Sequence, residues 1–311
     1  MKKLLYILLI AVGFACESTI NPTLEDAERI LVIDAWVNQK MERQEIRITR
    51  SQSYFDNSKP SKVSGAIVTV EDLNNGAVYT FQEGTDSYFW EPNGTPFGET
   101  GHQYRLTVTT NGETFEATST LGRQVAVDTI MFHHEDKNLL VREAHYEAEF
   151  FATDPTGLGD AYWIKTWKND QYLGKPGEIN IAVDGGFTAS QAVDGQVFIQ
   201  PIRRDLINPL DKVPGKQNEF LPPYVPGDKV YVEVHTIDQQ AFDFLWAVYY
   251  HTNHPGGLTE LFTIPLANAP TNIKNTQGNS TTKFAGFFNV AAVGAKEQVL
   301  TQEIANQAQQ K

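Results

Sequence analysis

The stretch YRLTVTTNGETFEAT, residues 104–118, gives the clearest indication of the fold. Two short runs rich in β-branched and aromatic residues, 104–109 and 114–118, stand on either side of Asn111-Gly112. Asn-Gly between two such runs is the strongest short-range signal for a β-hairpin, because a type I′ turn needs positive φ at both central positions. The sequence therefore predicts an antiparallel pair of strands here.

Further strand signals precede this hairpin. Residues 30–37 (ILVIDAWV) are rich in β-branched side chains, and residues 64–72 (SGAIVTVED) lead through Asn74-Asn75-Gly76 into residues 77–82 as a second hairpin. No amphipathic helix separates these short strands. This pattern is typical of an antiparallel β-sandwich, so we predict an immunoglobulin-like or transthyretin-like domain over residues 29–123.

The chain continues with a second β-rich region, which we predict over residues 124–294. Its strand signals include residues 161–168 (AYWIKTWK) and the strongly alternating residues 229–237 (KVYVEVHTI). One helix is expected at about residues 239–250, after Asp238 as the N-cap. Its apolar positions follow the spacing i, i+3, i+4, i+7: Phe242, Leu245, Trp246 and Tyr249. We predict that the three aromatic ones pack in the core and hold the helix against a sheet. Residues 295–311 are polar and Gln-rich, and we predict a tail.

Composition excludes several classes of function. The chain has 311 residues and a formal net charge of −13, and its Lys and Arg residues form no cluster that would neutralise nucleic-acid phosphates. The same acidity disfavours binding to anionic lipid through the protein surface. Because Cys16 is the only cysteine, a disulfide within the chain and a zinc–thiolate site are excluded.

The first residues, MKKLLYILLIAVGFAC, predict a secretory signal peptide over residues 1–15. Two lysines precede an apolar run that is too short to span a bilayer, and a small residue stands before the cut. The cysteine at the cut resembles a bacterial lipobox, which predicts that Cys16 is acylated and can be labelled with palmitate. Residues 16–28 are predicted to form a tether between the lipid and the folded part. The alternative is an ordinary secretory signal with an incidental cysteine.

Several segments together resemble one family. In chain order they are SGAIVTVED, GETFEATSTL, VDTIMF, GDKVYVEVHTIDQQAFDFLWAVYY, PLANAPTNI and FAGFFNVAAV. They resemble the DUF4249 family of Bacteroidota lipoproteins over nearly the whole mature chain. The resemblance implies an outer-membrane lipoprotein associated with a TonB-dependent β-barrel receptor, and it brings no catalytic residue and no cofactor. In such a lipoprotein Glu17, directly after the cysteine, favours a position on the cell surface.

Motifs for catalysis and for metal binding are missing from the sequence. It contains neither G-x-S-x-G nor H-E-x-x-H, and no phosphate-binding loop, so we predict a protein without enzymatic activity. A carboxylate pair for glycoside processing stays as a minor alternative. The acidic turns at residues 154–160, 184–186 and 194–195 do not follow the EF-hand pattern, and we interpret them as turn chemistry without a metal.

Aromatic residues provide the candidate contact residues. Trp163, Trp167 and Tyr172 gather around one predicted strand, where alternation places both tryptophans on one face, and Trp90 lies in the first predicted domain. If exposed, these rings can stack on sugars or anchor a partner protein; the alternative is packing in the core. Two functions remain open: an accessory lipoprotein of a TonB-dependent receptor system, and a surface module that binds a glycan or another nutrient.

Overall fold

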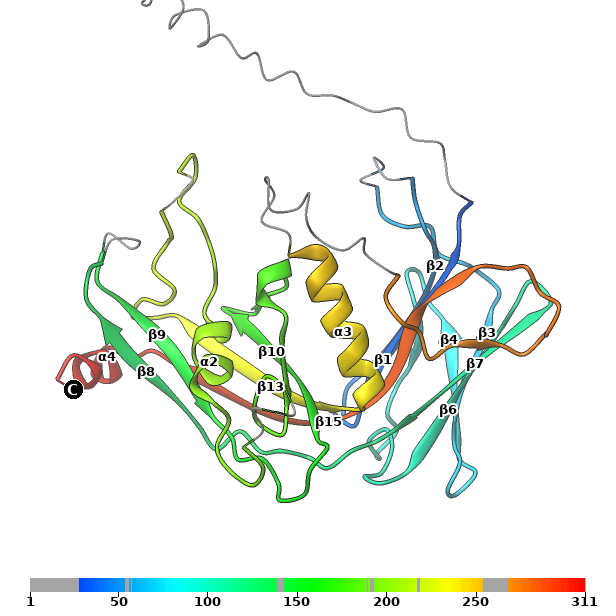
Figure 1. Ribbon diagram of the computed structural model, residues 1–311, viewed down its shortest axis with the longest axis horizontal. Coiled ribbons are helices and arrows are strands. Elements are labelled where there is room, and N and C mark those ends of the chain that lie inside the picture. Colours follow the sequence, from blue (N-terminus) through cyan, green and yellow to red (C-terminus); the bar gives the residue numbers. More distant parts are fainter. Residues whose placement is uncertain are drawn as a thin grey trace, which may run out of the picture.

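A computed structural model describes residues 28–53, 56, 58–138, 143–188, 190, 193–216, 219–253 and 268–310 of the chain. These residues form mostly strands with a few short helices, as the sequence predicts (Figure 1). Two β-rich halves follow one another along the chain, with β3, β4, β6 and β7 at one end of the molecule and β8 and β9 at the other. The predicted fold class is confirmed.

The strands of the first half are β1 (Leu31–Asn38), β2 (Gln44–Arg50), β3 (Ile67–Asp72), β4 (Val78–Glu83), β5 (Tyr88–Trp90), β6 (Gln103–Thr110) and β7 (Glu113–Thr120). The later strands are β8 (Thr129–Glu135), β9 (His145–Phe151), β10 (Ala161–Lys168), β11 (Gln171–Tyr172), β12 (Asn180–Val183), β13 (Lys229–Ile237), β14 (Lys274–Asn275) and β15 (Phe284–Val299). The helices are α2 (Gln200–Arg203), α3 (Gln239–Thr252) and α4 (Gln302–Ala308), with 3₁₀ turns η1 (Pro176–Glu178) and η3 (Asp205–Ile207).

Within the described residues, one large sheet connects both halves. Its strand order is β11-β10-β13-β15-β1-β2-β5-β4-β3-β6-β7-β14, with β12 paired to β10 beside this path, while β8 and β9 pair with each other. The predicted hairpin at residues 104–118 is β6–β7, and its turn residues Asn111 and Gly112 have φ values of 51° and 78°. This local prediction is confirmed.

The last strand, β15, holds the two halves together. Its first part pairs in parallel with β1, from Phe284 opposite Leu31 to Ala291 opposite Asn38. Its second part pairs antiparallel with β13, from Ala292 to Val299. Gly294 lies where the segment before β8 crosses this strand, and a Cβ there would lie 1.7 Å from the carbonyl oxygen of Val125. Only glycine permits this approach of two backbones.

Alternating side chains give the sheet two different faces. On one face, the odd-numbered residues of β1 from Leu31 to Val37 enter the first core, which they share with β3, β6 and β7. On the same side, Val230, Val232 and Val234 of β13 enter a second core with β8, β9, α2 and α4. The other face of β10 and β13 is therefore free of both cores.

Helix α3 partly covers this other face, where it packs in a third apolar cluster with residues of β10, β12 and β15 and with the end of β13 (Figure 1). The side chain of Asp238 caps it by accepting a hydrogen bond of 2.8 Å from the backbone N–H of Ala241. Phe242 is buried as predicted and Tyr249 is half-buried, but the prediction that Trp246 packs in the core is wrong, because its side chain is 47% exposed. The helix contacts the sheet along only one flank, which leaves Trp246 on the outside.

The prediction of a polar tail over residues 295–311 is also wrong for its described part. β15 continues to Val299, and α4 follows with Thr301 as its N-cap. Leu300 and Ala305 are fully buried in the second core. Ile304 and Ala308 also pack against this core, and these few apolar positions give no wide apolar stripe in the sequence.

Candidate functional site

The face of β10 and β13 opposite the second core carries polar and aromatic side chains. We call it the open face, and it is formed by Trp163, Lys165 and Trp167 from β10 and by Tyr231, Glu233 and His235 from β13. In the antiparallel register Trp163 lies opposite His235, Lys165 opposite Glu233, and Trp167 opposite Tyr231. Directly opposite residues project to the same side of a sheet, so six functional groups are brought together.

Three aromatic rings lie side by side on the adjacent strands β11, β10 and β13. Tyr172 on β11 pairs with Trp167, which pairs in turn with Tyr231, and we call these three residues the aromatic row. The ring centroids of Trp167 lie 5.2 Å from those of Tyr172 and 5.3 Å from those of Tyr231. Trp167 and Tyr231 are half-buried and Tyr172 is 42% exposed, so water reaches the row.

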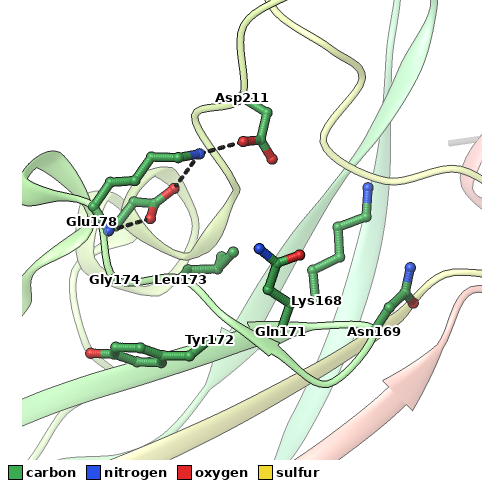
Figure 2. A pocket seen from close by; sticks show the side chains of 9 residues that line it. Lys168, Asn169, Gln171, Tyr172, Leu173, Gly174, Glu178 and Asp211 are labelled. Atoms are coloured by element: carbon green, nitrogen blue, oxygen red, sulfur yellow. Dashed lines mark hydrogen bonds and ion pairs between the residues drawn. The ribbon is translucent and has the colours of Figure 1, made fainter. Parts of the chain in front are cut away.

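A polar cavity of about 510 Å³ opens at the Tyr172 end of the row. It lies over the turn Asn169-Asp170, which joins β10 to β11 with φ values of 48° and 66°. Figure 2 shows Tyr172 and Gln171 on one side of this cavity and Asp211 and Glu178 on the other. The Lys175 ammonium pairs with both of these carboxylates. The Lys175 Nζ to Glu178 Oε1 distance is 3.5 Å, and these paired charges give the cavity a hydrophilic wall.

A second open cavity, of about 400 Å³, lies at the other end of the row. We call it the Lys165 cleft. Its lining combines the open face with the turn between β1 and β2: Asn38, Lys40, Glu42, Lys165, Trp167, Asp170, Tyr231, Glu233 and His235. The first half of the chain thus supplies one wall of the cleft and the second half supplies the other.

Glu233 is the centre of a hydrogen-bond network in this cleft. Its side chain is buried and accepts hydrogen bonds from Tyr231 Oη at 2.8 Å, from His235 Nε2 at 2.7 Å and from the ammonium of Lys40. Burial acts to raise the pKa of Glu233, but these donors and the nearby cations together hold it at about 2. Glu233 is therefore a carboxylate at every physiological pH.

The histidine in this network is neutral. Burial, followed by the charge of Lys165, lowers the pKa of His235 to about 4. A carboxylate only accepts hydrogen bonds, so the proton of the neutral ring is on Nε2, which faces Glu233. Burial and the bond to Glu233 also raise the pKa of Tyr231 to about 12.

Lys165 differs from these paired groups. Among the described residues its Nζ makes no hydrogen bond and no ion pair, and its nearest partner is the Trp163 ring, 4.0 Å from Nζ to the ring centroid. Burial lowers the pKa of Lys165 to about 8, in opposition to the attraction of Glu233 and Asp34. Sequence reasoning missed this residue and Glu233, although the alternation in KVYVEVHTI does place Glu233 and His235 beside Tyr231.

The structure separates the four aromatic residues predicted as contacts. Trp167 and Tyr172 lie in the aromatic row, and Trp163 is on the same face of β10 but packs against Trp36 with ring centroids 5.1 Å apart. Trp90 lies in the first half against Tyr79 and Phe97, at 5.3 and 5.7 Å, so it belongs to the packing there. Cys16 lies outside the described residues.

Two acidic turns that are distant in the sequence meet in space. Asp154, Asp160 and Asp184 offer carboxylate oxygens that lie within 4.8 Å of one another. Each has protein partners: Asp184 Oδ1 accepts from the N–H groups of Gly159 and Asp160, Asp154 Oδ1 accepts from Tyr162, and the Asp160 carboxylate pairs with Arg123. These bonds account for the cluster as turn structure, and we assign no metal to it.

The fold and the open face define a β-rich protein with an aromatic row between two polar surface cavities. A family described as a domain of unknown function, DUF4249, matches residues 17–297, and the chain belongs to this family. No curated protein matches the chain. Among the described residues, no helix has the length and apolar character needed to cross a membrane.

Proposed function

We propose that this protein is a non-enzymatic lipoprotein of the outer membrane, exposed on the cell surface, that binds a carbohydrate along the aromatic row. The observation that carries the proposal is the line of rings Tyr172, Trp167 and Tyr231 between two polar cavities. Aromatic faces pack well against the C–H faces of sugars, while polar groups at their edges bind the hydroxyls. Both components are present within one continuous surface.

A binding role is favoured over glycoside hydrolysis by the state of the buried carboxylate in the cleft, Glu233. A glycosidase needs one carboxylic acid with a raised pKa to protonate the leaving group. Glu233, the buried carboxylate of the Lys165 cleft, has its pKa held at about 2 and is saturated with hydrogen-bond donors. It cannot deliver a proton at neutral pH, and it stabilises the cleft instead.

The binding proposal is tested with Trp167→Ala and a matched control, Trp246→Ala. Trp246 is also an exposed tryptophan, but it lies on α3 outside both cavities of the aromatic row. On a glycan array, we expect the wild type and Trp246→Ala to bind the same sugars and Trp167→Ala to lose them. A base stacked on an aromatic ring contributes about 1–3 kcal/mol, and the same range for a sugar gives an expected loss of about 5- to 150-fold. Equal binding by both variants would contradict the proposal.

The anchor and the receptor partner rest on the sequence and on the family resemblance. We propose that Cys16 carries the lipid and that the protein accompanies a TonB-dependent receptor. Growth with labelled palmitate should mark the wild type and not Cys16→Ala. Protease added to whole cells should then remove the protein, and purification from solubilised outer membrane should recover a β-barrel receptor with it. Labelling of both forms, or protection from protease, would count against this part.

A further inference from the structure

Lys165 is an isolated cation inside a cleft where the acidic groups are already paired. The pairs that surround it are Glu233 with Lys40, Glu42 with Lys40 at 2.9 Å, Asp170 with Lys229 at 2.7 Å, and Asp34 with Arg47 at 3.7 Å. Lys165 stays beyond ion-pair distance of all of them and faces the Trp163 ring. A half-buried ammonium without a counter-ion is costly in free energy, and a bound anion removes that cost.

The position of Lys165 suits a ligand that also contacts the aromatic row. Lys165 and Trp167 are two residues apart on one face of β10, which places their Cα atoms about 6–7 Å apart. Both side chains line the Lys165 cleft. One sugar ring against Trp167 can therefore bring a carboxylate or a sulfate on its edge to Lys165 Nζ.

We propose that the cleft takes an acidic saccharide and that Lys165 binds its anionic group. This inference rests on the carbohydrate-binding function proposed above and specifies the class of ligand. Long-range electrostatic attraction does not bring an acidic saccharide to this protein, because the chain has a net charge of −13 and repels polyanions at a distance. The recognition must come from local chemistry, and Lys165 is the group that supplies it.

The test compares matched charged and neutral saccharides by titration calorimetry. Oligogalacturonate is compared with its neutral methyl ester, which tests a carboxylate. Dextran sulfate is compared with dextran, which tests a sulfate. We expect the wild type to bind one acidic member at least tenfold tighter than its neutral partner, and Lys165→Met to lose this difference. The control Lys229→Met, which removes a nearby lysine outside the cleft lining, should keep the affinity within about twofold.

The outcomes separate the two proposals. Equal affinity for the acidic and neutral members would overturn the inference and leave carbohydrate binding intact. No binding of any of these saccharides or of any array sugar would overturn both. Lys165→Arg keeps the charge and should keep the preference for the acidic probe. Melting temperatures of the variants that are no lower than that of the wild type show that lost binding is not lost folding.

The pH dependence gives a second, independent measurement. The wild-type affinity for the acidic probe should fall about tenfold from pH 7 to pH 9, because the free Lys165 amine loses its proton around pH 8. The groups that face Lys165 from β13, Glu233, His235 and Tyr231, have pKa values of about 2, 4 and 12, and that of Lys40 is raised. The remaining neighbours are the carboxyl groups of Glu42 and Asp170 and that of Asp34, whose pKa burial raises against the charges of Arg47 and Lys165. Lys165→Arg should abolish the pH dependence, and a wild-type affinity that is constant over this range would overturn the inference.

Discussion

Lys165→Met should make the protein more stable at neutral pH. Methionine has nearly the length of lysine and keeps the contact with Trp163, but it removes the unpaired charge. A pKa that falls from 10.5 to about 8 on folding corresponds to at most about 3 kcal/mol of unfavourable free energy. The side chain is only half-buried, so we expect a gain of about 1–2 kcal/mol, or about 1.5–3 °C in melting temperature for a chain of this length.

The size of this effect depends on pH. The folded-state pKa of Lys165 lies below the unfolded value, so its unfavourable contribution is complete below pH 8 and vanishes as the pH rises to 10.5. Thermal melts by circular dichroism at pH 7 and at pH 10.5 measure the difference. Lys229→Met is the control, because Lys229 is paired with Asp170 and its removal should give no gain. A Lys165→Met variant that is less stable than wild type at pH 7 would refute the reasoning.

Three further predictions concern the framework of the site. Gly294→Ala should cost several kcal/mol in urea denaturation, because its Cβ would clash with the Val125 carbonyl, whereas Gly278→Ala, in open space, should be neutral within about 0.5 kcal/mol. Glu233→Gln should lose about 3 kcal/mol at pH 7 by leaving Lys40 without its buried partner; this loss should shrink as the pH falls from 4.5 towards 2, since the folded pKa is about 2. Asp238→Ala should lose about 1 kcal/mol with the cap of α3, measured by thermal melts, and no loss would show that the cap is dispensable.

Local patterns predicted the local elements of this fold. Asn111-Gly112 identified the β6–β7 hairpin, and Asp238 with its apolar spacing identified α3. The pairing of β1 with β15 joins residues at opposite ends of the chain, and no local pattern encodes which distant strand lies beside which. For the same reason, residues assigned by sequence to the second region, such as Phe288 and Val290, lie in the first core.

The candidate site was predictable only in part. Trp167 and Tyr172 were identified because aromatic residues cluster in the sequence around one strand, and their pairing in the structure places the rings together. Lys165 was not identified, since a single lysine in a strand is an ordinary surface residue. Its character depends on which groups lie opposite on β13, and on the ion pair that Glu233 already makes with Lys40. Such a property belongs to the tertiary arrangement.

The long strand β15 also explains how the cleft is held in shape. Lys40 and Glu42 follow β1, whereas Lys165 and Glu233 belong to β10 and β13, so the two walls lie far apart along the chain. Because β15 pairs with both β1 and β13, both walls stand on one continuous sheet, and the Lys40–Glu233 ion pair connects them directly. A site built in this way is preorganised, which lowers the entropic cost of binding. The isolated charge of Lys165 then persists in the free protein, where it favours an anionic ligand.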